Sequence, residues 1–342
     1  MRILRAVAVR ALLSLGVLFG VSVLIFSMAR IIPGDPAAIA LGSTASVEQV
    51  EQLRIEMNLD KPIPVQYGIF LSNVLKGDLG KSLYSQRPVM TDLRQFLPAT
   101  LELVFFSAII MVVCGVTLGI LAARYRDTWV DSLIRVLSLG GIVTPAFVWA
   151  VILMLVFSYW LAVLPVAGRL SLGVTPPAHI TGLYVVDALL TGNWPVAWDA
   201  FRHLVLPATA LALSSVSQTA RLVRGSLIEV YGTPYIEMAQ AYGLSERRIS
   251  TSYALRPAMI PAMTVMGLDF AAKLGNAFLV EAVYAWPGLA RYGVQTILQK
   301  DLNAIVGVVL VISTFFLIVN IVVDLLVLVL NPKIRLQKRT PV

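Results

Sequence analysis

The residues closest to a catalytic motif are Gly80, Lys81 and Ser82, which end like a phosphate-binding loop. Such a loop needs a glycine five residues before the Gly-Lys pair, because backbone N–H groups there surround the phosphates. Position 75 is Leu, Gly77 lies too close, and no strand-like stretch comes before the loop. We therefore expect no ATPase site and no catalytic residue in this chain, which is not predicted to be an enzyme.

Metal and thiol chemistry also lack suitable residues. His179 and His203 are far apart and have no Cys or acidic partner at ligand spacing, and Cys114 is the only cysteine. We expect no metal site, no cofactor bound by this chain and no intrachain disulfide.

One pair of opposite charges lies within an apolar stretch. Asp269 and Lys273 are four residues apart with the acid first, which is the favourable order for an ion pair on a helix. A single charge at mid-membrane costs about 2.5–3.5 kcal/mol on insertion scales, so pairing is expected. Two interpretations remain open: a neutralised structural pair, or a pair that lines a pathway and selects charged solutes.

The longest polar stretch between late apolar runs is residues 235–261. Its first part has helical spacing, with one face formed by Ile236, Ala239, Gln240 and Gly243. Gly243 predicts the end of that helix, because glycine takes the left-handed C-terminal geometry without steric cost. Ser245 predicts the N-cap of a second short helix that carries Glu246, Arg247 and Arg248. The small residues on the first helix would let another surface come close.

The composition indicates a multi-span membrane protein. Hydrophobic residues make up 58% of the chain, charged residues 13%, and the mean hydropathy is +0.82. The net charge of +8 fits basic cytoplasmic loops that fix topology. No basic cluster with interleaved aromatics is present, so a nucleic-acid partner is not expected.

We predict an all-α integral membrane protein with six transmembrane helices and both termini in the cytoplasm. The predicted spans are residues 11–28, 100–123, 135–159, 204–220, 258–280 and 304–330. Each predicted inner end carries Arg or Lys. Gly140, Gly141 and Pro145 interrupt the third span, and the resulting kink suits either a pathway-lining helix or plain packing. We favour a retained first span over a cleaved signal.

The polar segments divide the chain into three parts. Residues 1–99 hold the first span and an outer loop, residues 100–331 hold five helices with a cytoplasmic loop at 222–257, and residues 332–342 form a basic cytoplasmic tail. Within the first outer loop, Ser46 opens an amphipathic helix at 47–57, and residues 65–75 form another apolar-faced helix. Pro33 and Gly34 end the first span, and Trp194 and Trp198 of the second outer loop suit a membrane interface.

Several of these segments together resemble the permease subunits of binding-protein-dependent ABC importers in the dipeptide/oligopeptide (peptide/nickel/opine) family. Glu237, Met238, Ala239 and Gly243 are similar to the family's EAA loop, from which Met238 departs. Residues 281–291 read from the residues alone as an aromatic interfacial anchor, and they resemble the family's ETxFxWPGLGR segment, with Ala282 and Ala290 departing from it. IPGDP at 32–36, GDLGKS at 77–82 and Asn331-Pro332 extend the resemblance over essentially the whole chain, which looks like the first of two permease subunits.

The resemblance implies a type I ABC importer permease fold in a bacterial inner membrane. Implied partners are a second homologous permease subunit, two cytoplasmic ABC ATPase subunits that use ATP and Mg, an extracytoplasmic solute-binding protein and membrane lipid. Implied ATPase-coupling residues are Glu237, Met238, Ala239, Gly243, Leu244 and Ser245, and our candidate pathway-lining residues are Pro145, Asp269 and Lys273. The solute implied is a di- or oligopeptide, although the family also carries nickel, glutathione, opines and sugars.

Three alternatives stay open. Residues 235–261 could form a basic amphipathic segment lying on anionic lipid. The chain could be a self-sufficient secondary transporter or channel, which should show internal repeats and intramembrane ion-site residues, and the two halves show no clear repeat. It could also be a membrane scaffold, although a scaffold would have no need for charges inside a span, which cost free energy.

Overall fold

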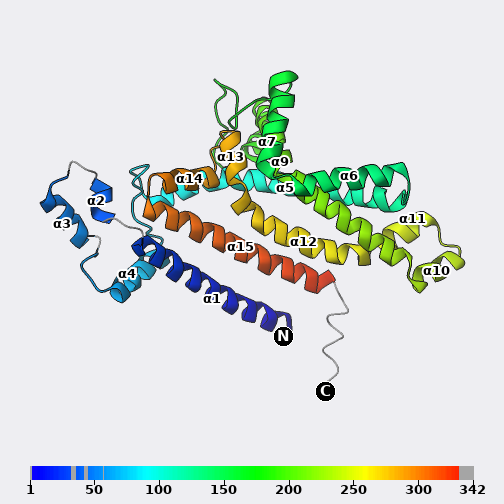
Figure 1. Ribbon diagram of the computed structural model, residues 1–342, viewed down its shortest axis with the longest axis horizontal. Helices are drawn as coiled ribbons and strands as arrows, with labels where there is room; N and C mark the ends of the chain where they lie inside the picture. The colour runs from blue at the N-terminus through cyan, green and yellow to red at the C-terminus, as the bar shows by residue number, and fades with distance from the viewer. Residues whose placement is uncertain (1, 32–35, 42–44, 57, 331–342) are drawn as a thin grey trace, which may run out of the picture. The chain divides into compact units, whose positions relative to one another are not determined.

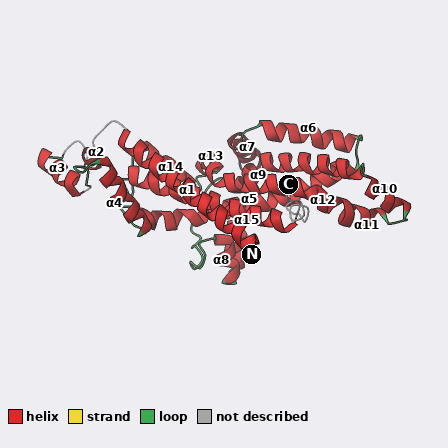
Figure 2. Ribbon diagram, turned by 90° about the horizontal axis from the view of Figure 1, so that it is seen from below, coloured by secondary structure: helices red, strands yellow, loops and turns green. Residues whose placement is uncertain are grey.

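The computed structural model of the chain describes residues 2–31, 36–41, 45–56 and 58–330, in which helices and loops occur but no strand (Figures 1 and 2). The helical elements are α1 (Arg2–Ile31), α2 (Pro36–Leu41), α3 (Val47–Glu56), α4 (Ile63–Leu75), α5 (Val89–Arg124), α6 (Trp129–Val143), α7 (Ala146–Leu153), η1 (Met154–Trp160), α8 (Tyr184–Leu190), α9 (Trp194–Tyr231), α10 (Pro234–Ala241), α11 (Glu246–Arg248), η2 (Ile249–Ala254), α12 (Leu255–Asn276), α13 (Phe278–Val283), α14 (Leu289–Leu298) and α15 (Leu302–Leu330). The predicted all-α class is confirmed for these residues. The predicted stop at Pro33 and Gly34 and the basic tail lie outside them.

Membrane-crossing length is clear for only some of the helices. Among the described residues, α5 and Leu302–Leu326 of α15 are long and apolar enough to cross a membrane. The segment from α6 to η1 would add a third crossing as a bent pair. The predicted count of six spans is not established by these helices.

The third predicted span is wrong as a single kinked helix. Its two halves, α6 and α7–η1, meet at 109°. Thr144 between them is extended (φ −84°, ψ 122°), and Pro145 precedes the first residue of α7. Proline disfavours helical geometry in the residue before it, so the chain breaks here and does not merely bend.

Two helices begin earlier than predicted. α5 starts at Val89 and contains Pro98, and α9 starts at Trp194 and contains Pro207. Asn193 caps α9 by accepting a hydrogen bond from the Val196 N–H at 3.4 Å. Both helices begin in segments predicted to be outer loops, α8 lies within the second of these loops, and α14 lies between the last two predicted spans.

One compact unit comprises residues 1–96 and 292–314. In it α4 packs on α1 through Tyr67, whose ring lies 5.3 Å from that of Phe26 and whose hydroxyl is 2.8 Å from Ser22 Oγ. Ser46 and Gln49 cap α3 reciprocally, which confirms the predicted start of that helix. Ser82 of the phosphate-loop lookalike donates to Asp301 at the start of α15, at 2.5 Å, so this loop serves as a structural clasp.

The other unit comprises residues 97–291 and the described residues from 315 to 330, and α9 is its central helix. α6, α7 and α12 pack against α9 (Figure 1), and so does α8. Glycines allow the closest approaches: a Cβ on Gly119 of α5 would lie 2.7 Å from Val223 Cβ, and one on Gly141 of α6 would lie 2.0 Å from Ser217 Oγ. Small residues at helix crossings are a common packing device in membranes.

Candidate functional site

The predicted helix-Gly-helix elbow is present in the second unit as α10, Gly243 and α11. Gly243 has φ +74°, and its N–H donates to the Gln240 carbonyl at 2.8 Å. The Leu244 N–H donates to the Ala239 carbonyl at 3.2 Å. These two bonds form a Schellman motif, which confirms the predicted helix stop at Gly243.

Ser245 stands at the predicted N-cap of α11. Its backbone is extended (φ −64°, ψ 143°), and its carbonyl accepts from the Arg248 and Ile249 N–H groups at 2.9 and 3.0 Å. Its hydroxyl makes no capping hydrogen bond. α11 runs directly into η2 and then α12, so the elbow is continuous with a long helix.

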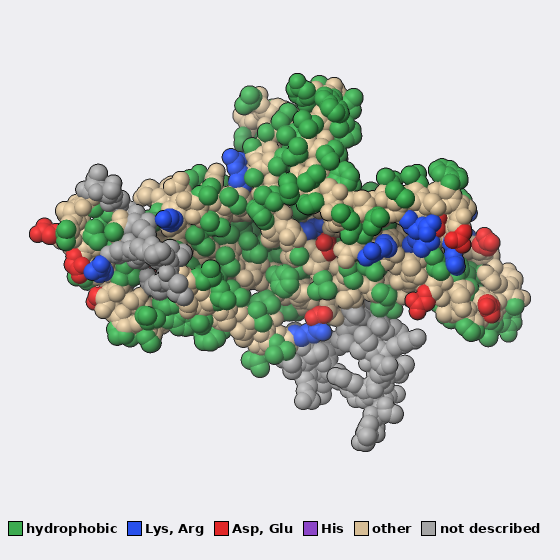
Figure 3. Space-filling view, viewed as in Figure 1, with side chains coloured by type: hydrophobic (Ala, Val, Ile, Leu, Met, Phe, Trp, Pro, Cys, Tyr) green, Lys and Arg blue, Asp and Glu red, His purple; other side chains and the backbone are tan. Residues whose placement is uncertain are grey.

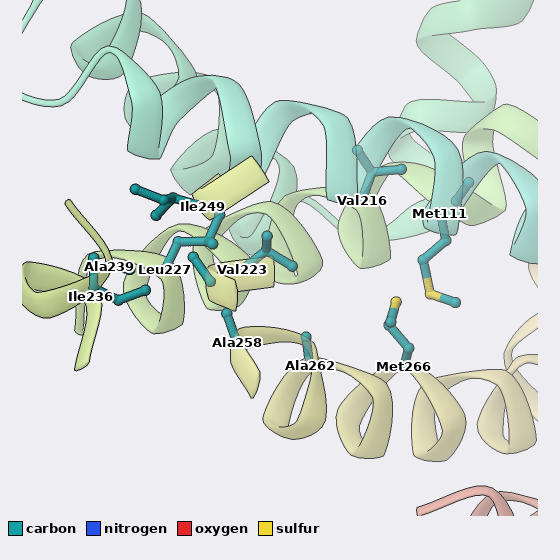
Figure 4. Close-up of a cluster of buried hydrophobic side chains, with 12 residues drawn as sticks. Met111, Val216, Val223, Leu227, Ile236, Ala239, Ile249, Ala258, Ala262 and Met266 are labelled. Atoms are coloured by element: carbon teal, nitrogen blue, oxygen red, sulfur yellow. The ribbon is translucent and has the colours of Figure 1, made fainter. Parts of the chain in front are cut away.

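One face of the elbow is buried in the core of the unit. Ile236 is 0%, Ile249 2% and Ala239 7% exposed. Figure 4 shows these side chains beside Leu227 and Val223 of α9 and Ala258 of α12. Burying an isoleucine side chain contributes about 1.5–3 kcal/mol, so this face holds α10 and η2 to the helices beneath them.

The opposite face of α10 is open. Tyr235 is 44%, Met238 58% and Tyr242 79% exposed, and Glu237 and Gln240 are also exposed. The predicted face of four residues is therefore divided. Ile236 and Ala239 are buried and contact the chain's own core. Gln240 and Gly243 are exposed and do not belong to that buried face.

Basic side chains accompany the elbow. Arg247 and Arg248 of α11 are exposed, and Figure 3 shows Lys and Arg atoms near α11 with Asp and Glu atoms beside them. The elbow therefore combines a buried apolar attachment with exposed aromatic, thioether and charged groups.

The structure pairs Asp269 and Lys273, as predicted. Lys273 Nζ lies 3.1 Å from Asp269 Oδ2. It also lies 2.6 Å from Ser215 Oγ and 3.2 Å from the Leu211 carbonyl, both on α9. The ammonium group therefore makes two hydrogen bonds to α9 and one ion pair within α12.

The two charges differ in access. The Lys273 side chain is 2% exposed and that of Asp269 is 25% exposed. Lys273 therefore fastens α12 to α9, and only Asp269 can meet a solute or water. Pro145, the third candidate pathway residue, is exposed at the break between α6 and α7.

The segment 281–291 was predicted as an interfacial anchor, and that prediction is wrong. Trp286 and Tyr284 are 1% and 2% exposed. Trp286 Nε1 donates to the Ala99 carbonyl at 2.9 Å, and the Tyr284 hydroxyl donates to the Ala150 carbonyl at 2.9 Å. The aromatic residues are buried because carbonyls of α5 and α7 satisfy their polar groups.

A buried carboxylate organises the same segment. Glu281 is 0% exposed, accepts a hydrogen bond from the Thr100 hydroxyl and accepts another from the Arg291 N–H at 2.8 Å. Thr100 Oγ1 in turn accepts from the Leu289 N–H at 2.7 Å. A Cβ on Gly288 would lie 2.2 Å from Glu281 Oε1, so only glycine fits beside this carboxylate.

A second buried ion pair was also missed by sequence reasoning. Arg169 Nη2 lies 2.5 Å from Glu102 Oε2, and these side chains are 7% and 2% exposed. The Arg169 guanidinium stacks 3.5 Å from the Tyr184 ring centroid, and Glu102 also accepts from the Val185 N–H at 2.8 Å. The only sequence signal was an isolated glutamate within an apolar run.

The loop before α8 is fixed by one carboxylate. Asp187 accepts from the N–H groups of Ile180, Thr181 and Gly182 at 2.8–3.2 Å. Burial alone would raise the pKa of Asp187, but these bonds and that from the Thr181 hydroxyl hold it below the usual range. Among the described residues, no group of three His, Cys, Asp or Glu side chains could hold a metal ion.

Two family descriptions match this chain. Residues 115–336 match the binding-protein-dependent transport system inner membrane component, and residues 3–104 match the N-terminal membrane component of such systems.

Curated relatives match over nearly their full length. The chain is 42% identical to the "Probable D,D-dipeptide transport system permease protein" of Escherichia coli strain K12, over 93% of this chain and 94% of the relative. It is 36% identical to the dipeptide transport system permease protein of Alkalihalophilus pseudofirmus, over 95% and 98%. It is 36% identical to the dipeptide transport system permease protein of E. coli K12, over 93% and 95%. The chain therefore belongs to the family of inner-membrane components of binding-protein-dependent transport systems.

Proposed function

We propose that this chain is a permease subunit of an ATP-driven, binding-protein-dependent importer of di- or oligopeptides. The named relatives are dipeptide permeases, which supports peptides as the solute class. In the proposed complex the chain forms half of the pathway beside a second, homologous permease subunit. Two cytoplasmic ATPase subunits use ATP and Mg, and an extracytoplasmic binding protein delivers the solute.

The observation that carries the proposal is the two-sided elbow. Its buried side, with Ile236 and Ile249, ties α10 and η2 to α9 and α12. Its open side offers Met238 and Tyr242 to another protein. A rigid helix held in this way can pass the movement of an ATPase to the helices that enclose the pathway.

The free energy that attaches the elbow to the core favours its moving with α9 and α12 as one rigid body. Detaching both isoleucines would cost about 3–6 kcal/mol at the usual value for buried aliphatic side chains. The Schellman motif at Gly243 fixes the angle between α10 and α11. A pull on the open face is therefore transmitted to α9 and α12 before the elbow detaches from them.

In the proposed topology the chain crosses the membrane six times, with the elbow and both termini in the cytoplasm. The arginines at 221, 224, 247 and 248 lie near or within the elbow, and basic residues favour the cytoplasmic side. Residues 164–193 face outward, where the binding protein docks. Asp269 and Lys273 are proposed to hold α12 to α9 and not to select the solute.

Reconstitution tests the proposal. The affinity-tagged chain, purified from its own host with a mild detergent, should carry a second permease and ATPase subunits, and proteoliposomes of this complex should import a labelled dipeptide. Uptake should require internal ATP and external binding protein, and an ion gradient should not replace ATP. Uptake by the chain alone, driven by an ion gradient, would refute the proposal and support a secondary transporter.

A further inference from the structure

A groove with apolar walls and a basic rim lies between α6 and α9. Its volume is about 320 Å³, and its lining residues are Ile134, Arg135, Ser138, Leu139, Ile142, Ala220, Arg221 and Arg224. None of the coupling or pathway candidates lines it.

The groove exists because the two helices are fastened on either side of it. A Cβ on Gly141 would lie 2.0 Å from Ser217 Oγ, so the helices touch there. Arg224 Nε and Nη2 donate to Asp131 at 2.6 and 2.7 Å and hold α6 to α9 a few turns away. Between these contacts Ala220, 1% exposed, is too small to fill the space.

The rim carries excess positive charge. Asp131, 0% exposed, is occupied by Arg224 and by the Asp127 N–H at 3.1 Å. Arg135 Nε is 3.7 Å from Asp131, and the Arg135 side chain is 53% exposed. Arg221 is exposed and has no acidic partner among the described residues. Arg135 also donates to Ser132 Oγ at 3.1 Å and shares Asp131 with Arg224, so the rim keeps a net positive charge.

We infer that the groove binds one anionic phospholipid, with its phosphate at Arg135 and Arg221 and an acyl chain along Leu139 and Ile142. Arginine binds phosphate oxygens through paired N–H donors. Basic pockets between membrane helices are suited to anionic headgroups, and the exposed Leu139, at 63%, continues the apolar wall toward the bilayer. A soluble anion would gain nothing from that wall. The inference requires only that the groove lies in a membrane, and not the transport role proposed above.

The first test measures lipid binding to the purified complex. Native mass spectrometry should show saturable binding of phosphatidylglycerol in preference to phosphatidylcholine with the same chains. Arg135→Gln/Arg221→Gln should weaken phosphatidylglycerol binding about 25-fold, since each guanidinium near a membrane surface contributes about fivefold. The charge-matched control Arg124→Gln/Arg126→Gln alters exposed arginines outside the groove and should change binding less than twofold. Equal losses in both variants, or no loss in either, would overturn the inference.

The second test identifies the occupant directly in membranes. A photoreactive residue at Leu139 should form a phospholipid adduct, and one at Leu133, which is 49% exposed on α6 but outside the groove lining, should form far less. An adduct at Leu139 with another protein subunit, or equal lipid adducts at both positions, would overturn the inference. Because neither test measures uptake, their failure is separate from failure of the proposed function.

Discussion

Gly243 and Gly288 both require glycine, but for different physical reasons. Gly243 has φ +74° and nothing within 4 Å of an added Cβ, so only its backbone geometry is special. Gly288 has no positive φ, but an added Cβ would lie 2.2 Å from the Glu281 carboxylate. Substitution at Gly243 therefore tests the angle of the elbow, and substitution at Gly288 tests the packing of a buried carboxylate.

Gly243→Val should impair coupling without removing the protein from the membrane. A left-handed backbone costs an ordinary residue about 1–2 kcal/mol, which changes the population of the correct elbow about 5- to 30-fold. Peptide-stimulated ATP hydrolysis by the purified complex should fall by a similar factor. Gly243→Asn is the matched control, because Asn tolerates this geometry, and it should keep most of the activity. Full coupling in the Val variant would show that the angle of the elbow is not needed.

Gly288→Ala should destabilise the fold itself. Overpacking costs about 1–3 kcal/mol, and here the displaced group is a buried carboxylate with two hydrogen bonds. The midpoint of thermal unfolding of the purified complex should drop, and less chain should be present in the membrane. Gly140→Ala, where an added Cβ meets nothing within 4 Å, should leave both unchanged. Equal stability of the two variants would contradict the assigned packing.

Helix ends that depend on neighbouring residues could be predicted from the sequence, whereas contacts with residues far away in the chain could not. Gly243 ends α10 through its left-handed backbone, and Ser46 starts α3 through its capping hydrogen bond. The elbow and α3 could therefore be predicted. The burial of Trp286 depends on a carbonyl 187 residues away, and the sequence does not reveal that partner. The same holds for the α9 partners of Lys273, although its pairing with Asp269 was predictable from their spacing.

The effect of a proline on a helix could not be predicted from the proline alone. Pro145 marked a disturbance, but whether a proline kinks or breaks a helix depends on the residue before it and on packing, so a kink was predicted where a 109° break occurs. Pro98 and Pro207 lie inside helices, although proline usually argues for a helix end.

The hydrogen bonds from Lys273 to α9 lead to a prediction about the charged pair. Lys273→Leu leaves Asp269 without its cation, and breaking a buried pair costs about 3–5 kcal/mol, so the complex should unfold at a lower temperature. Asp269→Gln/Lys273→Leu should restore most of that stability. Because Lys273 is locked onto α9, the double variant should keep the wild-type uptake ratio between charged and neutral dipeptides. A selective change in that ratio, with assembly intact, would place the pair in the pathway.

For the whole molecule the central question is which side of the membrane each surface faces. Thr175 precedes α8 and is exposed, Ser245 starts α11 and is exposed, whereas Ser82 is buried and unsuitable as a probe. In a Cys114→Ser background, Thr175→Cys should react with a membrane-impermeant maleimide on intact spheroplasts. Ser245→Cys should react only after the cells are opened. Labelling of Ser245→Cys on intact spheroplasts would invert the topology and remove the elbow from the cytoplasm.

Photocrosslinking from the open face of the elbow tests its proposed coupling role most directly. A benzoylphenylalanine in place of Tyr242, which is 79% exposed, should crosslink to an ATPase subunit in membranes. The same residue in place of Trp198, which is 63% exposed in the first turns of α9, should give no ATPase adduct. If the complex assembles and position 242 crosslinks only to lipid, or if position 198 captures the ATPase, the elbow is not the coupling surface.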